Sequence, residues 1–387
     1  MRFIFTMFFI VLLLPVYSQL VIEYDDFPQP ESYEIFRFVA DVNNVQIPAG
    51  GEDQIWDYSS LSVIDSSMTL FLSTEGDTTF PEAKYKTPSF LQFQGFIYDN
   101  TEYDGIDENG AYRVGSLPQD TSFSITQISG GPDDVIRFVG SPSPLDGRID
   151  FIKFPLSYQD TWTESFIETT VFELTVAAFG LNMVPGSRKR TLTQTRTVVG
   201  WGELITPNRE GGINEPREVL LVQASGITLD SFFLAGAPAP PPLIDAFGLT
   251  QGEIFENEFY LFFDQHDPSN LMRINIDGGE IISVFFKPDH NEISTSVSAV
   301  ELIPSTVYPN PISPMQELTI QTDQDLTNGT FILSDMNGRQ ALVRSIDSLP
   351  NENITISMPG YLTPGLYVFQ LISGNGNIRS IGKINVH

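Results

Sequence analysis

Short runs in which apolar and polar residues alternate recur along the chain, and this pattern limits the fold more than any other feature. A period of two places successive side chains on opposite faces of a strand, whereas amphipathic helix patterns are scarce here. Turn-forming clusters of Gly, Pro, Asn and Asp separate the runs, roughly every 8 to 12 residues. The 30 phenylalanines suit pleated surfaces packed face to face. The sequence therefore predicts an all-β protein with a sandwich-like architecture.

The predicted strands of the first 300 residues are the segments in which this alternation is clearest. They are residues 34–40, 68–73, 90–98, 111–115, 122–128, 135–139, 149–154, 161–174, 191–199 and 219–227. Residues 271–276 and 280–286 form a further pair, joined by Asp277-Gly278-Gly279. Because glycine accepts a positive φ at no steric cost, this pair is predicted to be a hairpin.

Two stretches interrupt the strand pattern. Residues 235–242 are rich in Gly and Pro, and proline has no N–H to donate within a central strand. We interpret this stretch as a loop or a boundary between subdomains. Residues 298–306 belong to a small and polar stretch and are predicted to be a linker. It would separate a large β-rich region, residues 19–297, from a smaller one, residues 307–387.

The N-terminus has the pattern of a signal peptide. Arg2 precedes an apolar run at residues 3–16, which is too short to cross a membrane comfortably. Val16 and Ser18 supply the small residues found three and one before a cleavage site. We therefore predict a signal peptide at residues 1–18, cleavage between Ser18 and Gln19, and no membrane span after its removal.

Composition excludes several kinds of function. The chain has no cysteine, which excludes disulfides, thiolate catalysis, thiolate metal ligation and a lipid anchor on cysteine. Its net charge is −29, most of it in the first 300 residues. Such an acidic surface repels phosphate backbones, which disfavours nucleic acid as a partner, and it attracts divalent cations. This charge keeps a protein soluble outside the cell.

Four motifs follow one another in the last 81 residues. They are Tyr308-Pro309-Asn310-Pro311, Asn337-Gly338, the run 362–369 and the closing run 382–386. Their order makes residues 307–387 resemble the type A C-terminal sorting domain of the type IX secretion system. The resemblance implies a small immunoglobulin-like β-sandwich whose sorting motif consists of Tyr308, Pro309, Asn310, Pro311, Gly365, Tyr367, Gly382 and Lys383.

The resemblance also implies a route and a set of partners. A protein with this tail is exported across two membranes, and its partners are the secretion translocon and a cysteine sortase that usually removes the tail. The remainder is then released or attached to lipopolysaccharide on the outer surface. The expected location is therefore extracellular or the surface of the outer membrane.

Within the tail, the alternation predicts strands at residues 318–321, 330–334, 340–344, 353–357, 365–372 and 378–386, arranged in two antiparallel sheets. Both faces of residues 366–371 are apolar, which predicts a central strand. Scattered patches around Trp56, Trp162 and Trp201 make residues 19–297 resemble a β-rich region of other secreted proteins that carry this tail. That second resemblance implies no activity.

The densest acidic loop offers a candidate calcium site. Asp104, Asp107 and Asn109 precede Gly110, and oxygen-bearing side chains at such spacing suit Ca²⁺. The EF-hand pattern fails, because Gly105 stands where its first Asp should be. The alternative interpretation is a hairpin turn through Asn109 and Gly110, and we favour it over the metal site.

Other candidate residues point less specifically to a function, because each group also has a structural interpretation. His266 and His290 each adjoin carboxylates, so the two loops would bind a metal if they met; solvated turns are the preferred interpretation. Glu164 and Glu168 are separated by roughly 13 Å along a strand, which is too far for them to form a glycosidase pair alone.

The tryptophans would stack on sugar rings or lie in the core. A basic cluster consists of Arg188, Lys189, Arg190 and Arg196, which suits an acidic polymer or a solvated hairpin flank.

These observations favour a secreted or surface-attached binding or structural module, whose ligand would be a polysaccharide or calcium. The alternative is an extracellular hydrolase such as a glycosidase. An enzyme needs a concave site where polar groups converge, whereas a module needs only an exposed binding face.

Overall fold

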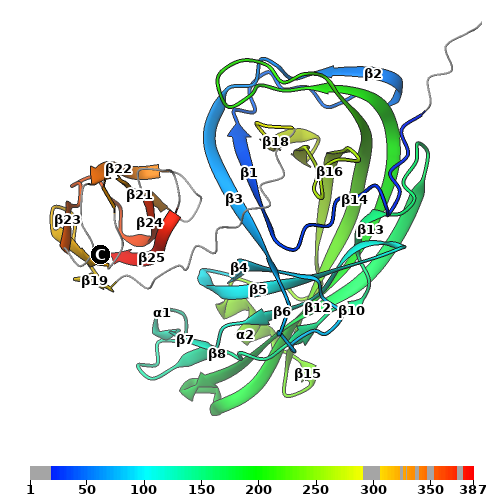
Figure 1. Cartoon of the computed structure of the whole chain (residues 1–387). Helices are drawn as coiled ribbons and strands as arrows, with labels where there is room; N and C mark the ends of the chain where they lie inside the picture. Colours follow the sequence, from blue (N-terminus) through cyan, green and yellow to red (C-terminus); the bar gives the residue numbers. More distant parts are fainter. Residues whose placement is uncertain are drawn as a thin grey trace, which may run out of the picture. The chain divides into compact units, whose positions relative to one another are not determined.

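The computed structural model describes residues 19–290, 306–322, 326–327, 329–335, 340–346, 353–372 and 378–387. The predicted signal peptide with Ser18, residues 298–305 of the predicted linker, and the Asn337-Gly338 motif lie outside the described residues, whereas the last residue of that linker, Thr306, begins a strand. The chain divides into two compact units, Met1–Ile293 and Ser294–His387. Both are built almost entirely of strands, so the predicted all-β class is confirmed (Figure 1).

The first unit contains eighteen strands in the part of the chain that the structure describes. They are β1 (Tyr33–Ala40), β2 (Gly51–Asp57), β3 (Val63–Ser73), β4 (Tyr85–Phe93), β5 (Phe96–Asp107), β6 (Gly110–Pro118), β7 (Thr121–Ser124), β8 (Val135–Phe138), β9 (Ser143–Pro144), β10 (Asp146–Gly147), β11 (Asp150–Lys153), β12 (Thr161–Val176), β13 (Leu181–Ile205), β14 (Arg217–Leu234), β15 (Ala237–Pro238), β16 (Glu253–Phe263), β17 (Met272–Asp277) and β18 (Glu280–Phe286). Short helical turns interrupt them at α1 (Thr126–Ser129), η1 (Ala177–Phe179) and α2 (Pro241–Ala246).

One continuous network of hydrogen bonds joins these strands. Its main run is antiparallel, in the order β3-β1-β18-β17-β16-β14-β13-β12-β8-β7. A second run, β3-β4-β5-β6, continues to β11. Strand β3 belongs to both runs, because residues 63–71 pair with β1 and Leu72 and Ser73 pair with β4. The two runs can therefore face each other across an interior.

Alternation on β14 explains how one strand serves two cores. Val219 and Leu221 face one apolar cluster with Trp56 and Phe262. Their neighbours Leu220 and Val222 face a second cluster on the other side of the sheet. A strand that is buried on both faces reads as a continuous apolar run, which is the pattern of central strands. Figure 1 shows β13 and β14 as long curved ribbons that extend through the unit.

Several predicted boundaries differ from the observed ones. The predicted strand 90–98 contains a turn at Gln94-Gly95, where Gln94 has a φ of 51°, and forms the end of β4 and the start of β5. The predicted strand 122–128 ends at Ser124 and is followed by α1. Strands β2 and β16 were not predicted. The Gly- and Pro-rich stretch 235–242 forms the short edge strand β15 and the start of α2, inside the first unit.

The second unit contains the two antiparallel sheets that the alternation predicted. One consists of β19 (Thr306–Tyr308), β20 (Glu317–Gln321) and β23 (Asn353–Ser357). The other has the order β22-β21-β24-β25, with β21 (Gly329–Asp335), β22 (Gln340–Ile346), β24 (Gly365–Ile372) and β25 (Ile378–Val386). Strand β24 pairs on both sides, which confirms the predicted central strand.

Side-chain and main-chain contacts join the first and last motifs of this unit. Asn310 Nδ2 donates to the carbonyl oxygen of Lys383 at 2.9 Å, and Asn310 Oδ1 accepts from the amide of Asn385 at 2.9 Å. Ile312 forms a bridge with Val386. Tyr367 is buried, and its hydroxyl donates to the carbonyl oxygen of Thr363 at 3.0 Å. Motifs that are more than 70 residues apart in the sequence therefore form one end of the sandwich.

The parallel pairing of β2 with β13 leads to the first testable prediction. Gly202 has a φ of 155°, and a Cβ at this position would clash with the carbonyl oxygen of Gln54. We expect Gly202→Ala to lower the free energy of unfolding by about 1–3 kcal/mol, because the strand must move to fit a methyl group. Urea unfolding measures the change. Gly95→Ala is the control, because a Cβ there meets no atom within 4 Å. Equal stability of the two variants would contradict the prediction.

Candidate functional site

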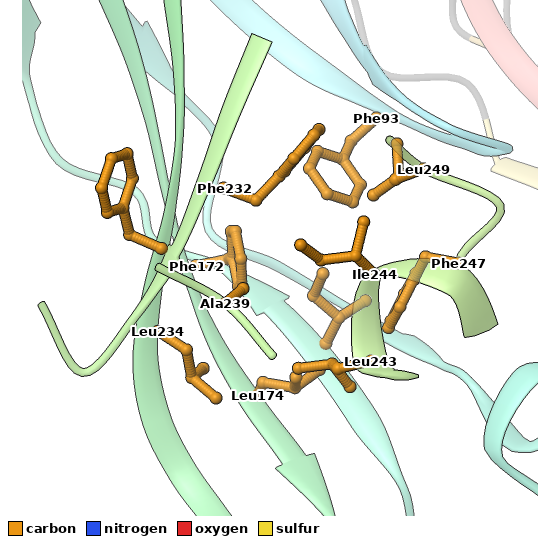
Figure 2. Close-up of a pocket in the computed structure, with 12 residues that line it drawn as sticks. Phe93, Phe172, Leu174, Phe232, Leu234, Ala239, Leu243, Ile244, Phe247 and Leu249 are labelled. Atoms are coloured by element: carbon orange, nitrogen blue, oxygen red, sulfur yellow. The ribbon is translucent and has the colours of Figure 1, made fainter. Parts of the chain in front are cut away.

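Two of the hollows in the first unit differ strongly in their chemistry. One lies under α2, where Phe93, Phe172, Phe232 and Ile244 point toward one another (Figure 2). Its lining is entirely apolar and its volume is only about 30 Å³. A dry apolar gap of this size belongs to the packing of the core. The other space has a volume of about 390 Å³ and a mixed lining, and it is the candidate site.

Four arginines line this larger space, which we call the arginine cavity. They come from four strands: Arg37 from β1, Arg113 from β6, Arg196 from β13 and Arg273 from β17. Two acidic residues share the lining, Glu102 and Asp104 of β5. The wall therefore carries more positive than negative charge, inside a protein whose net charge is −29.

Arg113 is the arginine whose charge is balanced. Its guanidinium group lies 2.6 Å from a carboxylate oxygen of Glu102 and 2.5 Å from one of Asp104. Burial raises the pKa of Asp104, and the charge and hydrogen bond of Arg113 oppose that shift. The three side chains form one partly buried ion-paired group with no net positive charge.

Arg37, Arg196 and Arg273 form the arginine trio, and their side-chain partners are neutral. Among the described residues no carboxylate oxygen lies within 4.0 Å of any of the three. An Nη atom of Arg37 donates to the carbonyl oxygen of Asn270 at 3.4 Å. Arg196 donates to the carbonyl oxygen of Asp150, and its buried Nε has no hydrogen-bond partner among the residues that the structure describes.

Arg273 is the least compensated member of the trio. Its Nε donates to Oδ1 of Asn275 at 2.7 Å, and its guanidinium lies 4.3 Å from the centroid of the Phe259 ring. Neither Nη atom of Arg273 has a hydrogen-bond partner within the described part of the chain. Two nitrogens of a half-buried cation are thus free to bind a ligand.

Burial disfavours the charged form of all three arginines, and their pKa values are lowered accordingly. Burial lowers the pKa of Arg37 to about 10, Asp267 partly opposes the shift, and the charge of Arg273 adds to it. Burial likewise lowers the pKa of Arg196 to about 10, against the attraction of Glu164, and Arg273 again repels. Burial also lowers the pKa of Arg273. With pKa values of about 10, Arg37 and Arg196 remain charged at neutral pH, and the charge of Arg273 acts against both.

Strand alternation explains why these arginines point inward. On β1, the buried Tyr33 and Ile35 share a face with Arg37. On β13, Gln194 and Arg196 precede the buried Val198 on one face. Sequence reasoning missed Arg37, Arg113 and Arg273. An arginine at a position that the alternation assigns to the interior is a signal that could have identified Arg37.

The candidate calcium residues lie in the hairpin of β5 and β6. Asp107 Oδ1 accepts from the amides of Asn109 at 2.8 Å and Gly110 at 3.1 Å, so its side chain closes the turn. Hydrogen bonds from Arg148 lower the pKa of Asp107. Asp104 faces Arg113 in the arginine cavity instead. Two arginines therefore already bind the carboxylates that would ligate calcium, and the calcium site stays a prediction.

The two histidine loops do approach each other, through Arg217. Its Nε lies 3.5 Å from Asp264, and it donates to the carbonyl oxygen of His290 at 3.2 Å. His290 is buried and lies 2.8 Å from the hydroxyl of Thr206, and burial lowers its pKa to about 4. Arg217 therefore places a cation between the two loops, beside the carboxylate of Asp264. The described residues contain no cluster of three or more His, Cys, Asp or Glu suited to a metal ion.

Acidic and aromatic candidates are mostly structural. Glu164 lies beside Asp150 and accepts from its amide at 2.8 Å; burial, followed by the hydrogen bond with Asp150, raises the pKa of Glu164 to about 7. Trp56 and Trp162 are buried in the core and offer no face to an external sugar. Trp201 is half-buried and packs against the second core cluster.

The basic cluster is divided by the fold. Arg188 binds Asp230, and Arg190 lies 3.3 Å from Glu168 and 3.6 Å from Asp230. Arg196 is only 4% exposed and lines the arginine cavity. The three arginines therefore do not form one surface for an acidic polymer.

Comparison with known proteins identifies the second unit. Residues 306–386 match the secretion system C-terminal sorting domain. The tail is a sorting domain of the type IX secretion system, as the motifs predicted. This sorting domain marks the protein for secretion to the cell surface or the extracellular space. No helix among the described residues is long and apolar enough to span a membrane.

The comparisons say less about the first unit. No curated protein sequence matches the chain. One similar solved structure is PorZ of Porphyromonas gingivalis, described as an essential surface component of the type IX secretion system. It has 9% identity and a TM-score of 0.19, over 83% of this chain and 63% of that chain. This chain therefore spans less than two thirds of PorZ, and the likeness is too weak to inform on the first unit.

Proposed function

We propose that this protein, exported through the type IX pathway by its sorting domain, is a binding module whose first unit holds an anionic ligand in the arginine cavity. The observation that carries the proposal is the arginine trio, whose cations converge without a carboxylate partner within 4.0 Å among the described residues. Burying unpaired charge is costly, so an anion among these groups would stabilise the folded state.

Size and lining support a small ligand. A volume of about 390 Å³ falls in the range of pockets for small molecules. Guanidinium groups bind carboxylate, sulfate and phosphate through paired N–H donors, and the free Nη atoms of Arg273 offer such a pair. The polysaccharide ligand predicted from the sequence stays a prediction.

The hydrolase alternative has less support at this site. Glycosidases place an acid and a second carboxylate on opposite sides of the scissile bond. Glu102 and Asp104, the carboxylates of the cavity lining, both bind Arg113 instead. No second function is therefore proposed.

Anion-dependent thermal unfolding tests the proposed function. We expect acetate or sulfate, exchanged for chloride at constant ionic strength, to raise the unfolding midpoint of the purified protein. A ligand at a hundred times its dissociation constant stabilises the native state by about 2.7 kcal/mol. Arg273→Met should abolish the response, whereas Arg137→Met should keep it, because Arg137 lies on the surface with Asp120 and Glu173.

Two results would overturn the proposed function. One is a midpoint that does not depend on any anion tested. The other is an anion response that persists unchanged in Arg273→Met, because the response would then arise elsewhere on the protein.

A further inference from the structure

The arginine cavity has a second chemical region beside its charged one. Tyr33, Phe71 and Tyr85 form an aromatic group, with Tyr33 stacked on Phe71 at a centroid distance of 4.5 Å and edge-on to Tyr85 at 5.2 Å. Ile35 and Ile106 pack with them. All five residues line the same cavity as the trio. The space therefore combines a large apolar surface with three cations that have no carboxylate oxygen within 4.0 Å among the described residues.

Strand β1 orders these two regions. Tyr33, Ile35 and Arg37 occupy alternate positions, so they project from one face of the strand. Four residues of extended chain separate Tyr33 from Arg37, which corresponds to roughly 13 Å. The aromatic region lies at the Tyr33 end, and the charged region at the Arg37 end, where Arg37 and Arg273 interact.

Neither a bare inorganic anion nor a neutral apolar molecule matches both regions. Sulfate or phosphate would neutralise the trio but leave most of the 390 Å³ against aromatic walls without contact. A neutral hydrocarbon would fill the aromatic region but leave the free Nη donors of Arg273 unpaired. A ligand with an acidic head and an apolar body satisfies both.

We propose that the ligand is an elongated amphipathic carboxylic acid, with its carboxylate among Arg37, Arg196 and Arg273 and its apolar body extended along β1 toward Tyr33, Phe71 and Tyr85. This inference rests on the proposed function and names the class of its ligand. Burial of the body removes apolar surface from water, and the bidentate pairing with guanidinium fixes the orientation.

Titration calorimetry with four compounds tests the inference on the purified protein. Octanoate carries both features, acetate and sulfate only the charge, and octan-1-ol only the chain. We expect octanoate to bind at least tenfold more tightly than each of the other three. Arg273→Met should weaken octanoate binding at least tenfold and leave octan-1-ol binding unchanged.

A variant that narrows the cavity between its aromatic and charged regions tests where the apolar body lies. Thr69 faces the cavity beside Phe71 and pairs with Ile35 across the strands. Thr69→Phe should weaken octanoate binding and preserve the response to acetate, which occupies only the charged end. Circular dichroism and an unfolding midpoint verify that each variant is folded.

The outcomes distinguish this inference from the function on which it rests. If sulfate and acetate bind as tightly as octanoate, the site binds anions but the amphipathic class is wrong. If octan-1-ol binds as tightly as octanoate, the arginines do not select the ligand, and the anion-binding function is wrong as well. Unaltered octanoate binding in Thr69→Phe would contradict the proposed position of the chain.

Discussion

Replacing Arg113 with Met should lower the free energy of unfolding by about 3–5 kcal/mol, whereas Arg273→Met should raise it by about 0.5–2 kcal/mol. The two arginines line the same cavity but differ in their partners. Removal of Arg113 leaves the carboxylates of Glu102 and Asp104 without their cationic partner, and Asp104 is only 8% exposed. Removal of Arg273 instead relieves repulsion with Arg37 and Arg196.

Urea unfolding in chloride, with no organic anion present, measures both effects. Matched Met substitutions keep most of the apolar stem, so the comparison isolates the charged group. The sign of the Arg273→Met change is the informative quantity. Loss of a residue that stabilises the fold would lower the free energy of unfolding, whereas we expect an increase. Destabilisation of similar size in both variants would mean that Arg273 is compensated in the native state.

Deletion of residues 307–387 should retain the first unit in the periplasm and reduce its export to near background. The physical reason is that the sorting domain is a folded unit, and the translocon can recognise its assembled surface only when it is intact. Cell fractionation with an antibody to the first unit measures the distribution. Normal amounts of truncated protein in the medium or on the cell surface would contradict the prediction.

A point variant provides a sharper control for the same experiment. Asn310 joins the first motif to β25 through its contacts with Lys383 and Asn385. Asn310→Ala should reduce export partially, because it loosens the junction of the motifs without removing the unit. Asn353→Ala, at an exposed position on β23, serves as the matched control and should be exported normally.

The sequence predicted the strand content and the tail well, because alternation and turn residues are local signals. The hairpin of β17 and β18 is an example: it was predicted from two alternating runs joined by Asp277-Gly278-Gly279, and the register confirms it. Strand β13 was predicted over only nine of its 25 residues. Its other parts contain glycines and adjacent charges such as Arg188 and Lys189, which are compatible with a strand only because β12 and β14 pair with them.

The candidate site was predicted poorly, since its residues are far apart in the sequence. Arg37 and Arg273 come together because β1, β18 and β17 are neighbours in the sheet, and no spacing in the chain encodes that order. Arg196 was noticed, but as part of a surface cluster with Arg188 and Arg190. Arg188 and Arg196 lie on one face of β13, but the strand is long enough that they have different surroundings: Arg188 binds Asp230, and Arg196 lines the arginine cavity.

The length of β13 has a consequence for how the first unit loses its structure. This strand pairs with β12 over residues 181–197 and with β14 over residues 186–204, so it borders more than one of the core clusters. When one end of such a strand detaches, the hydrogen-bonded ladder that supports the neighbouring cluster is broken too. We therefore expect the core clusters that border β13 to lose their structure together, so that a protease outside the cell cleaves at loops and edges before it reaches this ladder.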